Sequence, residues 1–215
     1  MGGEAIPIQT DVRDENAIKE MVDAVVQAWG GVDILINNAS ALNLMNTERI
    51  TAKQFDLIMN CNVRATFLSS QAVIPYLKQS KGSHILTMSP PLSLNAKWYK
   101  DYLGYSISKY GMSMCTLGLA EQFKDHHIHV NSLWPKTTIA TAAVEVNLPP
   151  QVYQASRKAS IMADAAYSIL TDSSQLNTGQ FYLDEDRLKE SDGVTNFDSY
   201  ALNPGVPLFP DAFVD

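Results

Sequence analysis

Short apolar segments alternate with longer amphipathic segments along most of the chain, and this order constrains the fold more than any other feature. The apolar segments have the length of β-strands: "EAIPIQT", "VDILINNAS", "SHILTMS", "IHVNSLWP" and "TGQFYL". Helical spacing of apolar residues follows Asp14 as far as Gly30, and it returns over residues 51–78 and 101–123. Strands and helices that alternate in this way form βαβ units. We therefore predict an α/β fold, with a doubly wound parallel sheet and helices on both faces, in one domain spanning residues 1–215.

Composition and charge exclude several classes of protein. Apolar residues make up 46% of the 215 residues and charged residues 18%, which is typical of a globular chain. The formal charge of −7 opposes a nucleic-acid surface, which needs clustered cations. No apolar run is long enough to predict a membrane span. The two cysteines, Cys61 and Cys115, form neither a disulfide framework nor a ligand spacing, so we expect a cytoplasmic location.

Polar residues follow the predicted strands at the points where the strands end. Asp11 follows the first strand, residues 37–40 the second, Ser89 the third and residues 135–137 the fourth. In open parallel sheets, ligands bind beyond the carboxyl ends of the strands. The sequence therefore predicts a cleft along one edge of the sheet.

The segment "YSISK" places Tyr105 and Lys109 on the same face of a helix, one turn apart. In chain order, "NNAS", "NCNVRATF", "ILTMS" and "YSISKYGM" resemble the short-chain dehydrogenase/reductase family. The segments "DVRDE", "SPPLSLN", "YGMSM", "LWPKT" and "ADAAYSI" resemble its hydroxysteroid dehydrogenase-like protein two branch. The resemblance covers nearly the whole chain, and it implies a Rossmann-like fold.

The resemblance implies four catalytic residues. Tyr105 would be the general acid/base, and Lys109 would lower the pKa of its phenol by favouring the phenolate. Ser89 would hydrogen-bond the substrate oxygen, and Asn62 would interrupt its helix and hold a water that relays protons through Lys109. Because Tyr105 lies 16 positions after Ser89, a wider spacing than is usual in the family, Ser93 stays open as the alternative serine.

The resemblance also implies a dinucleotide cofactor, NAD or NADP, without deciding between them. Asp11 and Val12 would meet its adenine, and Asn37 would line the site. The residues expected to contact the cofactor are Asp11, Val12, Asn38, Ala39, Ser40, Tyr105, Lys109, Pro135, Thr137 and Thr138. Lys136 stands where a glycine is common in the family, and it could contact a cofactor phosphate or a substrate carboxylate.

One family feature has no counterpart in the sequence. A TGxxxGxG turn, whose amides hold the cofactor's pyrophosphate, occurs nowhere in the chain. The family's first two strands, which flank this turn, precede "DVRDE" and are also missing. We therefore expect either a fragment of a longer protein or a fold completed in another way, with open edges on the strands that would have been their neighbours.

Two functions follow as hypotheses. The first is an NAD(P)-dependent oxidoreductase that interconverts a secondary alcohol and a ketone in a hydrophobic, lipid- or steroid-like substrate. The apolar residues 144–153 and the apolar C-terminal segment favour such a substrate. The alternative is a non-catalytic binding or association protein that has lost cofactor binding. The resemblance implies a homodimer or homotetramer that pairs through the helices at residues 51–78 and 101–123.

Other sequence features favour structural roles. His127 and His129 lack a carboxylate or cysteine at ligand spacing, so no metal site is predicted. The acidic run of residues 184–186 is interpreted as a solvated turn, and Met112 and Met114 as core or substrate-loop packing. The last 16 residues contain three prolines, and we expect them to lie extended against a protein surface, either their own or a neighbour's.

Overall fold

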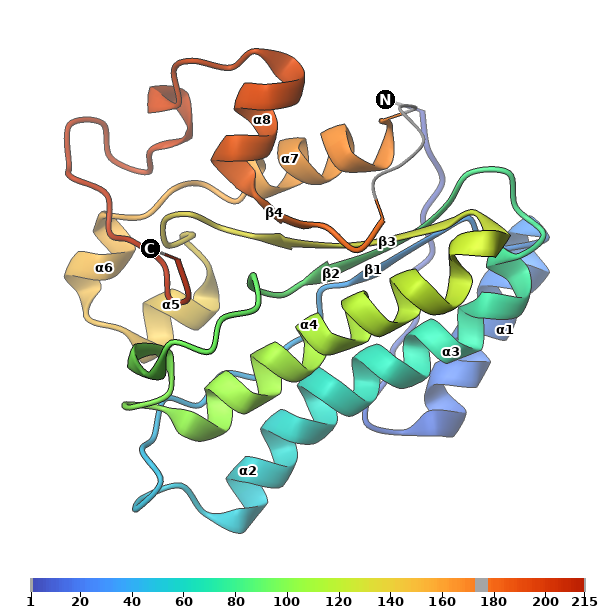
Figure 1. Ribbon diagram of the computed structural model, residues 1–215, viewed down its shortest axis with the longest axis horizontal. Coiled ribbons are helices and arrows are strands. Elements are labelled where there is room, and N and C mark those ends of the chain that lie inside the picture. Colours follow the sequence, from blue (N-terminus) through green and yellow to red (C-terminus); the bar gives the residue numbers. More distant parts are fainter. Residues whose placement is uncertain (1, 173–177, 215) are drawn as a thin grey trace.

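The computed structural model describes residues 2–172 and 178–214, and these form a parallel sheet between two layers of helices (Figure 1). The strands are β1 (Ile34–Asn37), β2 (Ser83–Met88), β3 (Ile128–Trp134) and β4 (Phe181–Leu183). They lie in the order β1-β2-β3-β4, and each neighbouring pair is parallel. The predicted α/β fold with a parallel sheet is confirmed.

Helices cover both faces of this sheet, as predicted. The helices α1 (Glu15–Trp29), α3 (Ala65–Leu77) and α4 (Leu103–Phe123) lie on one face, whereas α7 (Ser160–Leu170) and α8 (Asp184–Asp192) lie on the other (Figure 1). Three shorter helices are α2 (Ala52–Ile58), α5 (Ala142–Asn147) and α6 (Pro150–Gln154). In the described ranges no helix is both long and apolar enough to cross a bilayer.

The alternation of side chains along β2 and β3 divides the core into two parts. Ile85 and Val130 pack with α1, α3 and α4, while Leu86 and Leu133 pack with α7 and α8. All four side chains are at most 1% exposed. Strands covered on both faces carry apolar residues on both sides, and these residues explain why the pattern predicted β2 and β3 well.

The outer edge of the sheet differs from the sequence prediction. Residues 2–10 form no strand, so the strand predicted at "EAIPIQT" is wrong. β1 pairs with β2 alone among the described strands, and Ile34 and Ile36 are 42% and 46% exposed. A strand needs a hydrogen-bonded neighbour, and the described chain supplies none between residues 2–10 and β1. The open edge expected on this strand, where the family's first two strands would have paired, is therefore present.

Two further predictions concern single residues. The acidic run is not a solvated turn, because it forms the first turn of α8 and Asp184 is fully buried. Its Oδ1 accepts hydrogen bonds from the backbone N–H groups of Lys136 and Glu185. Of the two methionines, Met112 is buried in the core, as predicted, whereas Met114 is exposed.

Candidate active site

A cavity of about 560 Å³ lies at the carboxyl ends of the strands. Asn38 and Ser40 reach it from the loop after β1, Met88 from the end of β2 and Trp134 from the end of β3. Tyr105 and Lys109 line it from the first turns of α4. The sequence placed a cleft at this edge, and the structure has one there.

Lys109 lies at the floor of this cavity and is almost fully buried, with 3% of its surface exposed. Its Nζ donates to the backbone carbonyl of Met88 at 2.8 Å and to Ser40 Oγ at 3.4 Å. The same Nζ lies 4.9 Å from the ring centroid of Trp134, within cation–π range. The ammonium is thus fixed between the end of β2, the loop after β1 and the end of β3.

Burial is the largest influence on the pKa values of Tyr105 and Lys109. It lowers the pKa of Lys109 to about 7, while the nearby carboxylate of Asp211 acts in the opposite direction. Burial also raises the pKa of Tyr105 well above its ordinary value, and Asp211 and Tyr102 add to the rise. The sequence predicted a lowered pKa for Tyr105. The cost of desolvating a phenolate is the largest cause of the rise, and Lys109 is not among the groups that shift this pKa.

Asn62 lies in a π-helical segment, Met59–Arg64, between α2 and α3, so the predicted interruption of the helix is present. The side chain is fully buried. Its Oδ1 accepts from the backbone N–H of Ala41 at 2.7 Å and from Ser40 Oγ at 3.1 Å. Its Nδ2 donates to the carbonyl of Ala41 at 3.0 Å and to Ser108 Oγ at 2.9 Å. Asn62 therefore fixes the loop that carries Ser40 to α4, and the water relay stays a prediction.

The structure does not bring either candidate serine to the cavity. Ser89 is fully buried, and its Oγ lies 2.8 Å from Ser132 Oγ, which in turn bonds Thr116 Oγ1. The hydroxyl of Ser93 accepts from the backbone N–H of Asn95 at 3.2 Å in an exposed loop. Neither serine lines the cavity, whereas Ser40 does.

The predicted cofactor residues divide into two groups. Asn38, Ser40, Tyr105, Lys109, Pro135 and Thr138 line the cavity, and Ala39 lies between two of them in the chain. Asp11, Val12 and Thr137 lie outside its lining. The carboxylate of Asp11 is paired with Arg13 at 2.6 Å, and this contact lowers the pKa of Asp11 to about 2. Asn37 is buried, and its Nδ2 donates to Ser70 Oγ at 3.2 Å.

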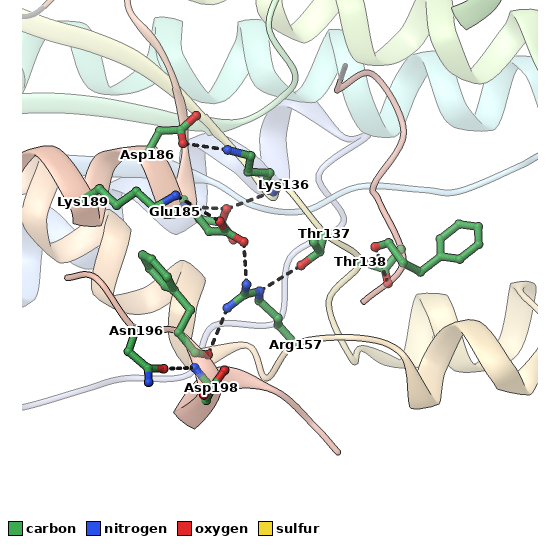
Figure 2. Close-up of polar contacts among 12 residues, drawn as sticks. Lys136, Thr137, Thr138, Arg157, Glu185, Asp186, Lys189, Asn196 and Asp198 are labelled. Carbon is green, nitrogen blue, oxygen red and sulfur yellow. Dashed lines mark hydrogen bonds and ion pairs between the residues drawn. The ribbon is translucent and has the colours of Figure 1, made fainter. Parts of the chain in front are cut away.

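A network of charges holds the loop after β3 against α8 (Figure 2). Lys136 Nζ donates to Asp186 at 2.8 Å, so its ammonium is paired with an acid of α8, and its contact with a cofactor phosphate or a substrate carboxylate stays a prediction. Arg157 donates to Thr137 Oγ1 at 3.1 Å and to Glu185 Oε1 at 2.6 Å. The side chains of Arg157 and Glu185 are only 7% and 12% exposed. This network fixes the backbone that carries Pro135 and Thr138.

Sequence reasoning linked the apolar C-terminal segment to a hydrophobic substrate, but it did not place that segment, or several aromatic residues, in the cavity lining. Phe209, Pro210, Asp211, Ala212 and Val214 all line the cavity, together with Trp98 and Tyr102. The prolines and apolar residues indicated an extended segment against some surface. No local pattern identified that surface as the cavity, because the contact joins residues far apart in the sequence.

Comparison with known proteins identifies the family of the chain. The profile of the family described as short chain dehydrogenase matches residues 1–150. The chain belongs to the short-chain dehydrogenase family. It is 53% identical over 214 residues to hydroxysteroid dehydrogenase-like protein 2 of Bos taurus and 52% identical over 215 residues to the Homo sapiens protein of that name. These alignments cover 100% of the chain and 50% and 51% of the two relatives.

A solved structure supports the same assignment. The chain is 44% identical to a short chain dehydrogenase from Mycobacterium thermoresistibile, with a TM-score of 0.91. The superposition covers 100% of the chain and 76% of that structure. The short-chain dehydrogenase described here lies in the hydroxysteroid dehydrogenase-like protein 2 branch, and it spans about half the length of the curated relatives.

Proposed function

We propose that this chain acts as an NAD(P)-dependent oxidoreductase that interconverts a secondary alcohol and a ketone, with Tyr105 as the general acid/base. The observation that supports the proposal is that Tyr105 and Lys109 line one mainly apolar cavity at the carboxyl ends of the strands. A phenol and an ammonium in such a cavity can move a proton to or from a carbonyl oxygen and stabilise the charge that develops there.

The residues at the cavity floor fit the nicotinamide end of the cofactor, which the family generally binds. Asn38, Ser40, Lys109 and Pro135 would hold that end, since all four line the same cavity as Tyr105. The bound nicotinamide would supply or accept the hydride. None of the eleven glycines in the sequence forms a TGxxxGxG turn, so no pyrophosphate contact is assigned to this chain.

Tyr105 would exchange the proton on the substrate oxygen. Because burial raises its pKa, the phenol is protonated at neutral pH and is ready to donate to a ketone oxygen. Lys109, held by Met88 and Ser40, would stabilise the phenolate that remains after transfer. Asn62 would act through its bonds to the Ser40 loop, as a positioning residue. Ser89 would support the core behind the site rather than bind the substrate oxygen.

The cavity lining favours a hydrophobic substrate. Its exposed surface is contributed mainly by apolar and aromatic side chains, namely Leu42, Leu44, Trp98, Tyr102, Ile139, Val144, Leu148, Phe209 and Val214. A volume of about 560 Å³ lies within the range of roughly 300–1,000 Å³ found for small-molecule pockets. A lipid- or steroid-like alcohol or ketone is the class that this surface suits.

Tyr105→Phe tests the proposal directly. Turnover is followed by NADH or NADPH consumption at 340 nm with 2-decanone and with a 3-ketosteroid, and cofactor binding by NAD(P)H fluorescence. Loss of general acid catalysis should reduce turnover by roughly 10²-fold or more, while cofactor binding is kept. Tyr76→Phe, on α3 and away from the cavity, is the matched control. Undiminished turnover in Tyr105→Phe would exclude the assigned role, and a chain that binds neither cofactor would favour a non-catalytic function.

We also propose that the protein is a homodimer or homotetramer of the cytoplasm. Phe67 on α3 and Met114 and Leu117 on α4 are 49–61% exposed, which is an unusual exposure for large apolar side chains on neighbouring helices. Sedimentation velocity would measure the subunit number, and a monomer at micromolar concentration would contradict the proposed pairing. Both cysteines are free, which suits a reducing compartment.

A further inference from the structure

The C-terminal segment, residues 209–214, forms one wall of the cavity. Its backbone is bonded to three different parts of the chain: the loop after β3, the end of α6 and the indole of Trp134. The bonds are Thr138 N to Phe209 O (2.9 Å), Phe209 N to Ala155 O (2.9 Å), Asp211 N to Lys136 O (3.2 Å) and Trp134 Nε1 to Ala212 O (2.8 Å). A segment held at four points is a fixed part of the site.

Phe213 anchors the end of this wall. Its side chain is 3% exposed, and its ring centroid lies 5.1–6.3 Å from those of five aromatic residues: Trp98, Tyr102, Tyr105, Tyr110 and Trp134. Its backbone has a φ of 69°, in the left-handed region that residues other than glycine rarely adopt. Such a conformation persists only where surrounding contacts hold it, and here the aromatic cluster does so.

Asp211 places a carboxyl group on this wall. Among the residues that line the cavity, Asp211 is the only one with a carboxyl group and Lys109 the only one with a basic side chain. Burial raises the pKa of Asp211 to about 7. The backbone N–H of Ala212, the ammonium of Lys109 and the indole of Trp134 favour its ionised form, while the charge of Asp184 opposes it. Above neutral pH the wall therefore carries a negative charge inside an apolar cavity.

The ammonium of Lys109 does not offer an open site for a substrate anion. It already donates to Met88 O and Ser40 Oγ and faces Trp134. The Asp211 carboxylate is a further, electrostatic partner. An anionic ligand would therefore meet the carboxylate of Asp211 in surroundings of low polarity, where like charges repel strongly. A neutral ligand of the same length avoids this repulsion.

We propose that Asp211 determines substrate specificity by charge: the cavity accepts neutral alcohols and ketones and rejects apolar substrates that carry a carboxylate. This inference rests on the proposed function, because it takes the cavity as the substrate site. It assigns to the C-terminal segment a role in selection that no part of the Tyr105 mechanism requires.

Ligand binding tests the inference without cofactor or turnover. The 215-residue chain is titrated at pH 8 with 1-decanol and with decanoate, and tryptophan fluorescence reports binding because Trp98 and Trp134 line the cavity. The wild type should bind decanol more tightly by roughly tenfold or more, the effect of one like-charge contact in a protein interior. In Asp211→Asn the two affinities should come within about threefold of each other, chiefly through tighter decanoate binding.

Two further variants make the result decisive. Asp56→Asn removes the same charge from the exposed surface of α2 and should keep the wild-type preference. Asp211→Ser serves if Asp211→Asn does not fold, as judged by circular dichroism, and should also lose the preference. A preference kept by both Asp211 variants, tighter binding of decanoate by the wild type, or no binding of either ligand would overturn the inference. If charge selection is found but Tyr105→Phe keeps its turnover, only the proposed catalytic role falls.

Discussion

Arg157 and Glu185 form a buried ion pair behind the candidate site, and replacing Arg157 alone by an uncharged residue should destabilise the fold strongly. The guanidinium lies 2.6 Å from the carboxylate, and the two side chains are 7% and 12% exposed. It also donates to Thr137 Oγ1 and to the carbonyl of Phe197, each at 3.1 Å (Figure 2). Truncating one partner of such a pair leaves a buried charge without compensation, which costs about 3–5 kcal/mol.

We therefore expect Arg157→Met to lower the free energy of unfolding by about 3–5 kcal/mol. The contact of Lys189 Nζ with Glu185 Oε2, at 3.7 Å, offsets part of the loss, which favours the lower end of that range. Glu185→Gln should cost less, because Arg157 keeps its bonds to Thr137 and Phe197. The double variant should be more stable than the sum of the single effects predicts, by roughly 1–3 kcal/mol, since no charge is then left alone.

Urea unfolding followed by far-UV circular dichroism measures all four proteins of this cycle. Lys19→Met is the matched control, because it breaks the Lys19–Glu15 pair, whose side chains are 59% and 47% exposed, and it should leave the urea midpoint close to that of the wild type. The reasoning is refuted if Arg157→Met lies within about 1 kcal/mol of the wild type, or if the double variant equals the sum of the single ones.

Three further predictions concern stability. Gly111→Ala should lower the free energy of unfolding by about 1–3 kcal/mol, because the new Cβ would lie 2.6 Å from a methyl carbon of Val63. Gly118→Ala on the same helix has open space and should raise it by up to about 1 kcal/mol. Calorimetry that ranks the two variants in the reverse order would contradict this packing argument. Asn62→Leu should lower the urea midpoint, because the backbone N–H and C=O of Ala41 lose their partner, at a cost of about 1–3 kcal/mol each. An unchanged midpoint would exclude the role of Asn62 in holding this loop. Since the folded-state pKa of Asp211 is raised to about 7, the folded chain binds more protons than the unfolded one between pH 4 and 7. The stability of the wild type relative to Asp211→Asn should therefore fall as pH rises through that range, and thermal melts with a constant difference would argue against it.

Much of the fold could be predicted because buried parallel strands and amphipathic helices leave strong local patterns. β2, β3 and α1 lie where the apolar spacing placed them, and the two residues that bounded the helical spacing, Asp14 and Gly30, are the N-cap and the C-cap of α1. The strand predicted at "EAIPIQT" failed for a non-local reason, because strand formation depends on a neighbour that local sequence does not specify.

The candidate site was predictable in its residue types but not in its orientations. Tyr105 and Lys109 line one cavity because helix periodicity places them on the same face of α4, and Asn62 contacts the lining through Ser40. The hydroxyl of Ser89 bonds that of Ser132 in the core instead of facing the cavity, and the order of residues in the chain does not predict this partner. The raised pKa of Tyr105 and the position of Asp211 both depend on burial created by distant segments, so neither has a local signature.

The outer row of backbone groups on β1 has a consequence for handling the protein in solution. Ile34 and Ile36 stand beside N–H and C=O groups that pair with no strand in the described part of the chain. An unpaired strand edge with exposed apolar side chains is a template with which a strand of another chain can pair. The 215-residue chain should consequently self-associate as its concentration rises. Ile34→Lys or Ile36→Lys should reduce this self-association by placing a charge on the open edge.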